Sequence, residues 1–182
     1  MMNARHTGGF SLLELVVVIA IIGILLAVAI NRLLPYIDEA ERIGVLTLES
    51  QIKGTLTLSA AKRIAGGKAA SILELDGSNP MHLMLEAPQN YVGERRGNEL
   101  ASVPPRNWYF DVSTRQLVYH KGEPYSSTGN RGLMDDPAFS VHVAYADRNG
   151  DGSFQAGTDE LYGVRLHRVA GADWLAGNEA RQ

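Results

Sequence analysis

The chain contains no cysteine. This excludes disulfides, thiolate metal sites and a cysteine nucleophile, and it removes the usual sign of an oxidising compartment. Clustered positive charge is also missing, since the net charge is -3 and the 17 Lys and Arg residues are scattered along the chain. Without a basic surface to neutralise phosphates, nucleic-acid binding is not expected.

Familiar catalytic patterns are absent as well. The five histidines fall in different predicted elements without the spacing of metal ligands. The chain has no GxSxG, no HExxH and no glycine loop that could hold a phosphate. The sequence therefore predicts a protein that is not an enzyme.

One long apolar run stands out in a chain that is 45% hydrophobic and 20% charged. As a helix, Phe10 to Ile30 would be about 31 Å long, which matches the hydrocarbon core of a bilayer. The short polar leader before it carries Arg5, and positive charge on that side keeps the amino terminus in the cytoplasm. The rest of the chain is then expected on the opposite side of the membrane.

Two ordinary explanations of this run conflict with one residue, Glu14. A secretory signal peptide would be cleaved at small residues such as Ala27-Val28-Ala29, but the run is long for that purpose and an acid near its start is out of place. A plain membrane anchor has no reason to carry an ionisable group, which costs about 2.5 to 3.5 kcal/mol inside the hydrocarbon. Glu14 therefore points to a more specialised segment.

The stretch Gly9-Phe10-Ser11-Leu12-Leu13-Glu14, followed by uncharged residues to Ile30, resembles the class III signal of type IV pilins and of the pseudopilins of type II secretion systems. The resemblance implies that a prepilin peptidase cleaves between Gly9 and Phe10 and that the new amino group of Phe10 is methylated. It further implies a single-pass protein of the bacterial inner membrane with a periplasmic carboxy-terminal domain. Its expected partners are homologous pilin or pseudopilin subunits, the peptidase and an inner-membrane assembly platform.

The same resemblance gives Glu14 a function in assembly. Cleavage would expose an ammonium group on Phe10, and the carboxylate of Glu14 in a neighbouring subunit could neutralise it when the helices pack. The alternative is that Glu14 extends toward the lipid headgroups, because it lies only about one turn inside the apolar boundary.

Beyond the apolar run the sequence predicts an α+β fold. The helix is expected to continue over 31–65 and to end at Ala65-Gly66, since an apolar stripe recurs every three or four residues. Its members are Ile37, Ala40, Gly44, Leu48, Ile52, Leu56, Ala60 and Ile64, with charged residues, Glu49 among them, between them.

Residues 66–102 are expected to connect the helix to the sheet, and the resemblance implies that this is the variable region of the family. Within it, Asn79-Pro80 predicts a short helix over 81–86. Residues 103–182 are then expected to form an antiparallel sheet of about four strands. The predicted strands are 107–112, 117–120, 139–146 and 161–169, and in the last of them Tyr162, Val164 and Leu166 should share one face.

The last predicted hairpin is connected by an acidic loop, 147–160. Its oxygen-bearing side chains alternate and are followed by glycine, which resembles the first half of a calcium-binding loop. The expected ligands are Asp147, Asn149, Asp151, Ser153, Asp159 and Glu160. The loop departs from the pattern at Thr158, where a bidentate acid would close the site, and a solvated acidic turn is the alternative.

The choice between filaments depends on the resemblance. A chain without cysteine and with an acidic loop near its carboxy terminus is similar to the major pseudopilins, which use calcium where many pilins use a disulfide. The chain is longer than is typical of those major pseudopilins, so type IV pilins and minor subunits are not excluded. A calcium-dependent surface-binding module, or an adhesive minor pilin, is the alternative function and has only the acidic loop in its support.

Overall fold

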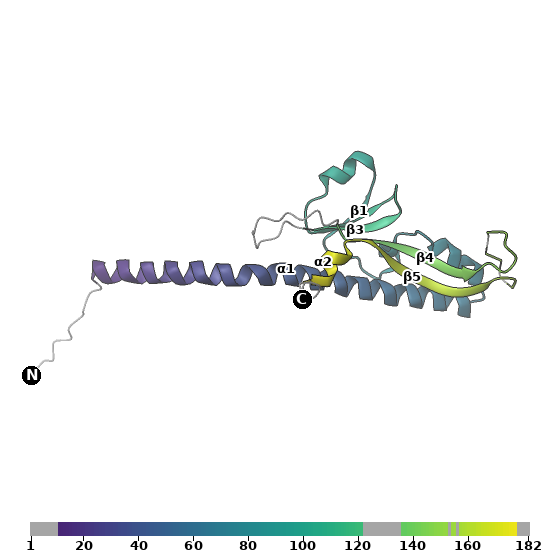
Figure 1. The fold of residues 1–182 in the computed structure, drawn as a ribbon, viewed down its shortest axis with the longest axis horizontal. Helices are drawn as coiled ribbons and strands as arrows, with labels where there is room; N and C mark the ends of the chain where they lie inside the picture. Colours follow the sequence, from purple (N-terminus) through teal and green to yellow (C-terminus); the bar gives the residue numbers. More distant parts are fainter. Residues whose placement is uncertain (1–10, 122–135, 153, 156, 178–182) are drawn as a thin grey trace, which may run out of the picture.

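A computed structural model describes residues 11–121, 136–152, 154, 155 and 157–177. A single helix, α1 (Leu12–Ala65), dominates it, and only the second half of this helix is covered by the rest of the chain (Figure 1). The helix runs through Pro35 and ends where predicted, because Gly66 and Gly67 follow and Gly67 adopts a positive φ of 70°. Lys62 and Arg63 in its last turn complement the negative end of the helix.

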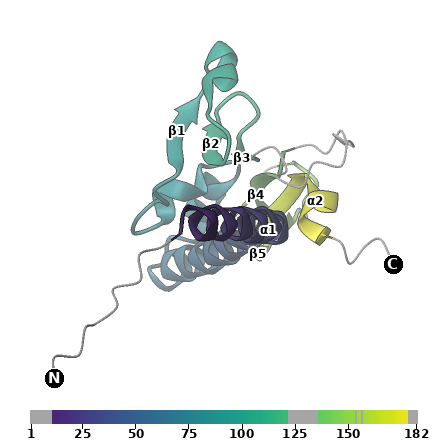
Figure 2. The ribbon, with the colours of Figure 1, turned by 90° about the vertical axis from the view of Figure 1, so that its left-hand side faces the viewer.

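The sheet has five strands in the order β1-β2-β3-β4-β5. They are β1 (Tyr91–Arg95), β2 (Asn107–Asp111), β3 (Gln116–His120), β4 (Ala138–Ala146) and β5 (Glu160–Ala170). Neighbouring strands are antiparallel except β1, which pairs with β2 in parallel. The predicted α+β class and the two hairpins are confirmed, and the sheet packs along one side of α1 (Figure 2).

The fifth strand, β1, was missed because its sequence, YVGER, does not alternate between apolar and polar residues. It lies in the connecting region together with three short 3-10 helices, η1 (Ala69–Leu75), η2 (Pro80–Leu83) and η3 (Gly97–Ser102). The predicted cap at Asn79 is confirmed, since its side chain accepts a hydrogen bond from the backbone N–H of Met81. The helix that it caps ends at Leu83 instead of extending to Glu86.

The core lies between the sheet and the second half of α1. Leu48, Ile52, Leu56 and Ala60 of the predicted stripe are buried, against sheet residues such as Trp108 and Phe139. Four other members of the stripe are wrong, because Ile37, Ala40 and Gly44 near its start and Ile64 at its end are exposed. Glu49 is only 2% exposed although the sequence suggested a polar position, since it bonds to Arg168 of β5.

One predicted face of β5 is also wrong. Tyr162 is 61% exposed, whereas Leu161 packs against the core with Val164. The register between β4 and β5 shifts at this point, and Gly163 has a φ of 133°. A β-bulge at Gly163 therefore reverses the alternation predicted from the sequence.

A last short helix, α2 (Ala172–Ala176), follows β5 directly. The guanidinium of Arg42 on α1 donates to the backbone carbonyl of Leu175 at 2.8 Å, and Trp174 packs beside Tyr119. This segment fixes the end of the sheet close to the middle of α1 (Figure 1).

Candidate functional site

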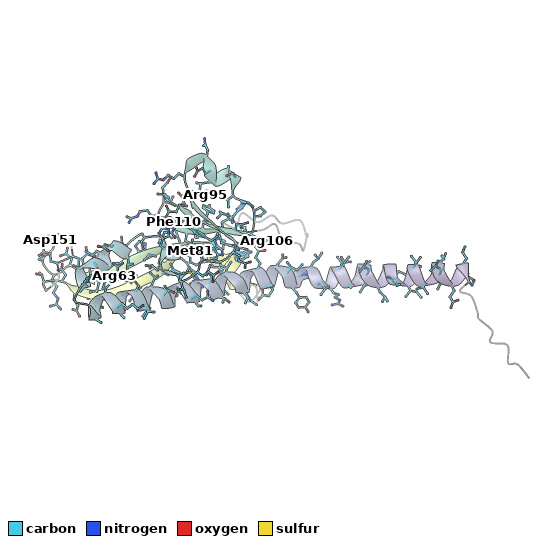
Figure 3. The ribbon with its side chains drawn as sticks, turned by 180° about the vertical axis from the view of Figure 1, so that it is seen from behind. Arg63, Met81, Arg95, Arg106, Phe110 and Asp151 are labelled. Carbon is cyan, nitrogen blue, oxygen red and sulfur yellow. The ribbon has the colours of Figure 1, made fainter. Side chains whose placement is uncertain are left out.

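Among the described residues, none covers the apolar part of α1. Its residues Leu12 to Ile30 are all exposed, and their side chains extend from every side of the helix (Figure 3). By length and composition α1 could cross a membrane. Glu14 lies in its first turn and is the only charged residue before Arg32 in this part of the helix. The predicted cleavage residues, Gly9 and Phe10, lie outside the described residues.

The second half of α1 has an unusual outer face, opposite the sheet. Exposed residues recur on it every three or four positions, and none is charged: Ile43, Thr47, Gln51, Gly54, Leu58 and Ala61. Between Ile43 and Ala61 only Glu49 and Lys53 carry charge, and these bond to each other at 2.6 Å on the flank nearest β5. A helix face in contact with water normally carries charged residues, so the absence of charge on this face requires an explanation.

The hydroxyl groups near this face are also engaged within the helix. Thr47 donates to the carbonyl of Ile43, Ser50 to Leu46 and Thr55 to Gln51, at 2.8 to 3.0 Å. Such bonds leave the methyl and methylene groups of these side chains as the exposed surface. Gly44 and Gly54 have open space beside them, where another backbone could approach closely. We call the set Ile43, Thr47, Gln51, Gly54, Leu58 and Ala61 the outer face.

The comparison with protein-family models bears on the apolar run itself. The model of the prokaryotic N-terminal methylation motif matches residues 4–30. The motif supports a type IV pilin-like protein. The match covers the leader and the exposed half of α1, and the long helix packed on a sheet agrees with such a protein. No solved structure matches the chain.

The acidic loop connects β4 and β5 at the end of the molecule that lies away from the exposed half of α1, where Asp151 is labelled in Figure 3. The two carboxylate oxygens of Asp147 accept hydrogen bonds of 2.7 Å from the amides of Gly150 and Gly152. The bond from Gly152 and that from Gly150 hold the pKa of Asp147 below its usual value. Gly152, the sixth residue counted from Asp147, has a φ of 77°, and a calcium loop requires a sharp turn at that place.

The second half of the loop is arranged differently. Asp159 accepts from the amides of Arg148 and Gln155, at 2.9 and 2.6 Å, so it lies across the base of the loop. Glu160 forms an ion pair of 2.6 Å with Arg148. Asn149 and Asp151 bond to each other at 3.0 Å, and Ser153 lies outside the described residues.

The structure therefore brings Asp147 and Asp159 into one hydrogen-bonded loop but directs Glu160 to an arginine. Within the part of the chain that the structure describes, no group of three or more acidic or histidine side chains is close enough to hold a metal ion. The donor chemistry and the turn at Gly152 fit the first half of a calcium loop, whereas the closing ligand is not assembled in this arrangement.

Sequence reasoning missed the ion pairs that join α1 to the sheet. Arg168 donates to both oxygens of Glu49, at 3.0 and 2.6 Å, and Arg106 donates to Glu41 at 2.8 Å. Burial raises the pKa of Glu49, but the hydrogen bonds from Arg168 and Lys53 outweigh it, and the net pKa is lowered. The available signal was the position of Glu49 beside the apolar residues Leu48 and Ile52, which places an acid at the edge of the buried stripe.

Proposed function

We propose that this protein is a structural subunit of a type IV pilus-like filament, either a type II secretion pseudopilus or a type IV pilus. It would be inserted in the inner membrane as a prepilin, cleaved between Gly9 and Phe10, methylated at Phe10, and assembled through α1. Its partners would be further subunits of the same kind, the prepilin peptidase and the assembly platform in the membrane.

The observation that carries this proposal is the lack of charge on the outer face of α1, from Ile43 to Ala61. Between the apolar run and the outer face α1 carries the exposed charged residues Arg32 and Glu39, but no member of the outer face is charged. Helices that associate without water between them use small residues and satisfied hydroxyl groups at their contacts. A protein with only a membrane anchor would need the apolar run but would gain nothing from the outer face.

Glu14→Ala tests the assembly role. We expect the variant to be inserted and cleaved as the original chain is, because the peptidase site lies before it, but to be missing from sheared filaments. An unpaired ammonium group on Phe10 would remain in the apolar core, which is strongly unfavourable. Glu39→Ala is the matched control, since Glu39 is an exposed acid on the same helix that pairs with Arg42 of the next turn, and it should assemble normally. Normal incorporation of Glu14→Ala would contradict the proposal.

We further propose that the 147–160 loop binds calcium. The residues that would hold it are Asp147, Asn149, Asp151 and Asp159, with Ser153 and Glu160 as the remaining candidates. The metal would stabilise the β4–β5 connection by neutralising acids that now bond to backbone amides.

Thermal unfolding of the full chain in detergent, with calcium and with a chelator, tests this second proposal. Binding at a hundred times the dissociation constant would add about 2.7 kcal/mol to the free energy of unfolding and raise Tm by several degrees. Asp147→Asn should remove most of this shift. Equal melting temperatures with calcium and with chelator would exclude the site.

A further inference from the structure

The structure contains a groove between α1 and β5 that nothing in the described part of the chain fills. Its volume is about 320 Å³, and it is lined by Lys53, Leu56, Thr57, Val164, Arg165 and Leu166. Leu56 and Leu166 are almost fully buried and form an apolar floor. Lys53 and Arg165 are exposed at the rim, so the groove combines an apolar interior with positive charge.

A surface projection formed by Leu85 and Glu86 lies in the connecting region, and its chemistry is complementary to that of the groove. The side chain of Leu85 is fully exposed, more so than that of any other large apolar residue described, and Glu86 beside it is exposed too. Leu83 and Met84, which precede them, pack against the core. The amide of Tyr91 bonds to the carbonyl of Pro88 on the other side. The projection is therefore held at both ends, which lowers the entropy lost when it binds.

The carboxylate of Glu86 and the guanidinium of Arg165 are both available to bind a partner. Among the described residues, neither Glu86 nor Arg165 forms an ion pair or a hydrogen bond through its side chain. An acid next to an exposed leucine, and a basic residue at the rim of an apolar groove, are complementary in both charge and polarity.

The two features lie at opposite edges of the sheet. Asn79, at the start of η2, bonds to Tyr91 and Glu94 of β1, at 2.8 and 3.1 Å, so the projection belongs to the β1 edge. The groove is formed by β5, the strand at the other edge. A chain cannot fill its own groove in this arrangement. Contact between different patches of identical subunits is heterologous, and such contacts generate open helical filaments when they do not close into a ring.

Edge-to-edge pairing of strands would be a different way to use β5, and the structure opposes it. The strand has two irregularities in its register, and Arg168 points inward to Glu49. Bulges and inward-pointing charges are devices that protect sheet edges from pairing. The groove beside the strand is therefore a better candidate for contact than its backbone edge.

We propose that Leu85 and Glu86 of one subunit dock in the α1–β5 groove of a second copy of this chain. Leu85 contacts the floor formed by Leu56 and Leu166, and Glu86 pairs with Arg165 at the rim. The inference rests on the proposed filament function and names a contact between the globular domains within it.

Cross-linking of the full chain in the cells that make it tests this contact, and the absence of native cysteines makes the result specific. In the chain carrying both Leu85→Cys and Thr57→Cys, mild oxidation of filaments should give a covalent ladder of many subunits. Each single variant should give no species beyond a dimer. The matched control pair, Leu85→Cys with Gln51→Cys, places the second cysteine on the outer face of the same helix and should give no ladder.

Charge reversal provides the second measurement, with exposed residues whose exchange should leave the fold intact. Glu86→Arg or Arg165→Glu in the doubly cysteine-bearing chain should lower the cross-linked fraction about tenfold, and the two reversals together should restore it. Filaments that form without a ladder, a ladder of equal strength in the control pair, or no rescue by the double reversal would each overturn the contact and leave the filament function standing. Failure of the unmodified chain to enter any filament would overturn both.

Discussion

At the scale of single residues, the ion pair between α1 and β5 is the feature with the largest consequence for stability. Glu49 is buried among apolar side chains, and its carboxylate is compensated by Arg168 and Lys53. A buried charge of this kind is tolerated only while its partners remain in place. The pair also fixes where β5 lies along the helix.

Stability should therefore fall in acid through Glu49. Its pKa in the folded chain is lowered from 4.5, so its contribution is present above pH 4.5 and is lost as the pH falls through the lower folded value. Chemical unfolding of the full chain in detergent, measured from pH 7 down to about pH 3, should show this loss.

Arg168→Met is the control for that measurement. Removing the main partner should cost about 2 kcal/mol at pH 7, because a buried carboxylate loses charged hydrogen bonds. The variant should also lose less stability than the original chain between pH 5 and about 3, since the pKa of Glu49 is no longer held down. Parallel pH profiles for the two proteins would show that Glu49 is not the group responsible.

At the scale of elements, β5 and α1 use glycine for opposite reasons. Gly163 forms the bulge in β5 with a φ of 133°, a conformation that other residues avoid. Gly54 lies inside α1, where glycine weakens a helix. A methyl group added at either glycine would meet no other atom. The two positions therefore differ only in backbone conformation, which is helical at Gly54 and has a positive φ at Gly163.

Alanine at the two positions should consequently have effects of opposite sign. Gly163→Ala should destabilise the chain by about 1 kcal/mol or more, and Gly54→Ala should stabilise it by about 1 kcal/mol. Thermal unfolding of both variants in detergent measures the difference. A destabilising Gly54→Ala would mean that the helix is already in close contact with another part of the chain at that position.

At the scale of the whole molecule, α1 has two surfaces with different partners. Between Ile43 and Ala61, Glu49 is buried against the domain and Lys53 pairs with it at the flank beside β5, whereas the outer face is uncharged and directed away from the domain. An ordinary amphipathic helix carries charged residues on the side that faces water, and the outer face lacks them. The arrangement favours a protein whose final environment is other copies of the same helix.

Charge on the outer face should then block assembly without unfolding the subunit. Leu58 is 55% exposed, so Leu58→Lys should leave Tm within about a degree but reduce incorporation into sheared filaments at least about tenfold. Asn98→Lys in η3, also exposed but far from α1, should assemble normally. Equal incorporation of both variants would show that the outer face faces solvent in the filament.

The sequence by itself determined the long helix, the methylation motif and the main hairpins, because these depend on local periodicity and on a short continuous signal. It predicted Leu48, Ile52, Leu56 and Ala60 as core for the same reason. It placed Tyr162 wrongly because a bulge in β5 reverses the alternation of its side chains. It placed Glu49 wrongly because the partner that allows its burial, Arg168, comes from a distant strand.

Only the tertiary structure decided which side of α1 is covered, and hence that the uncovered side lacks charge. Thr47 and Gln51 look like ordinary polar surface in the sequence, because the pattern of a helix does not tell which flank the sheet will occupy. Leu85 and the α1–β5 groove lie at opposite edges of the sheet because of the order of its strands. That order depends on contacts between residues far apart in the chain.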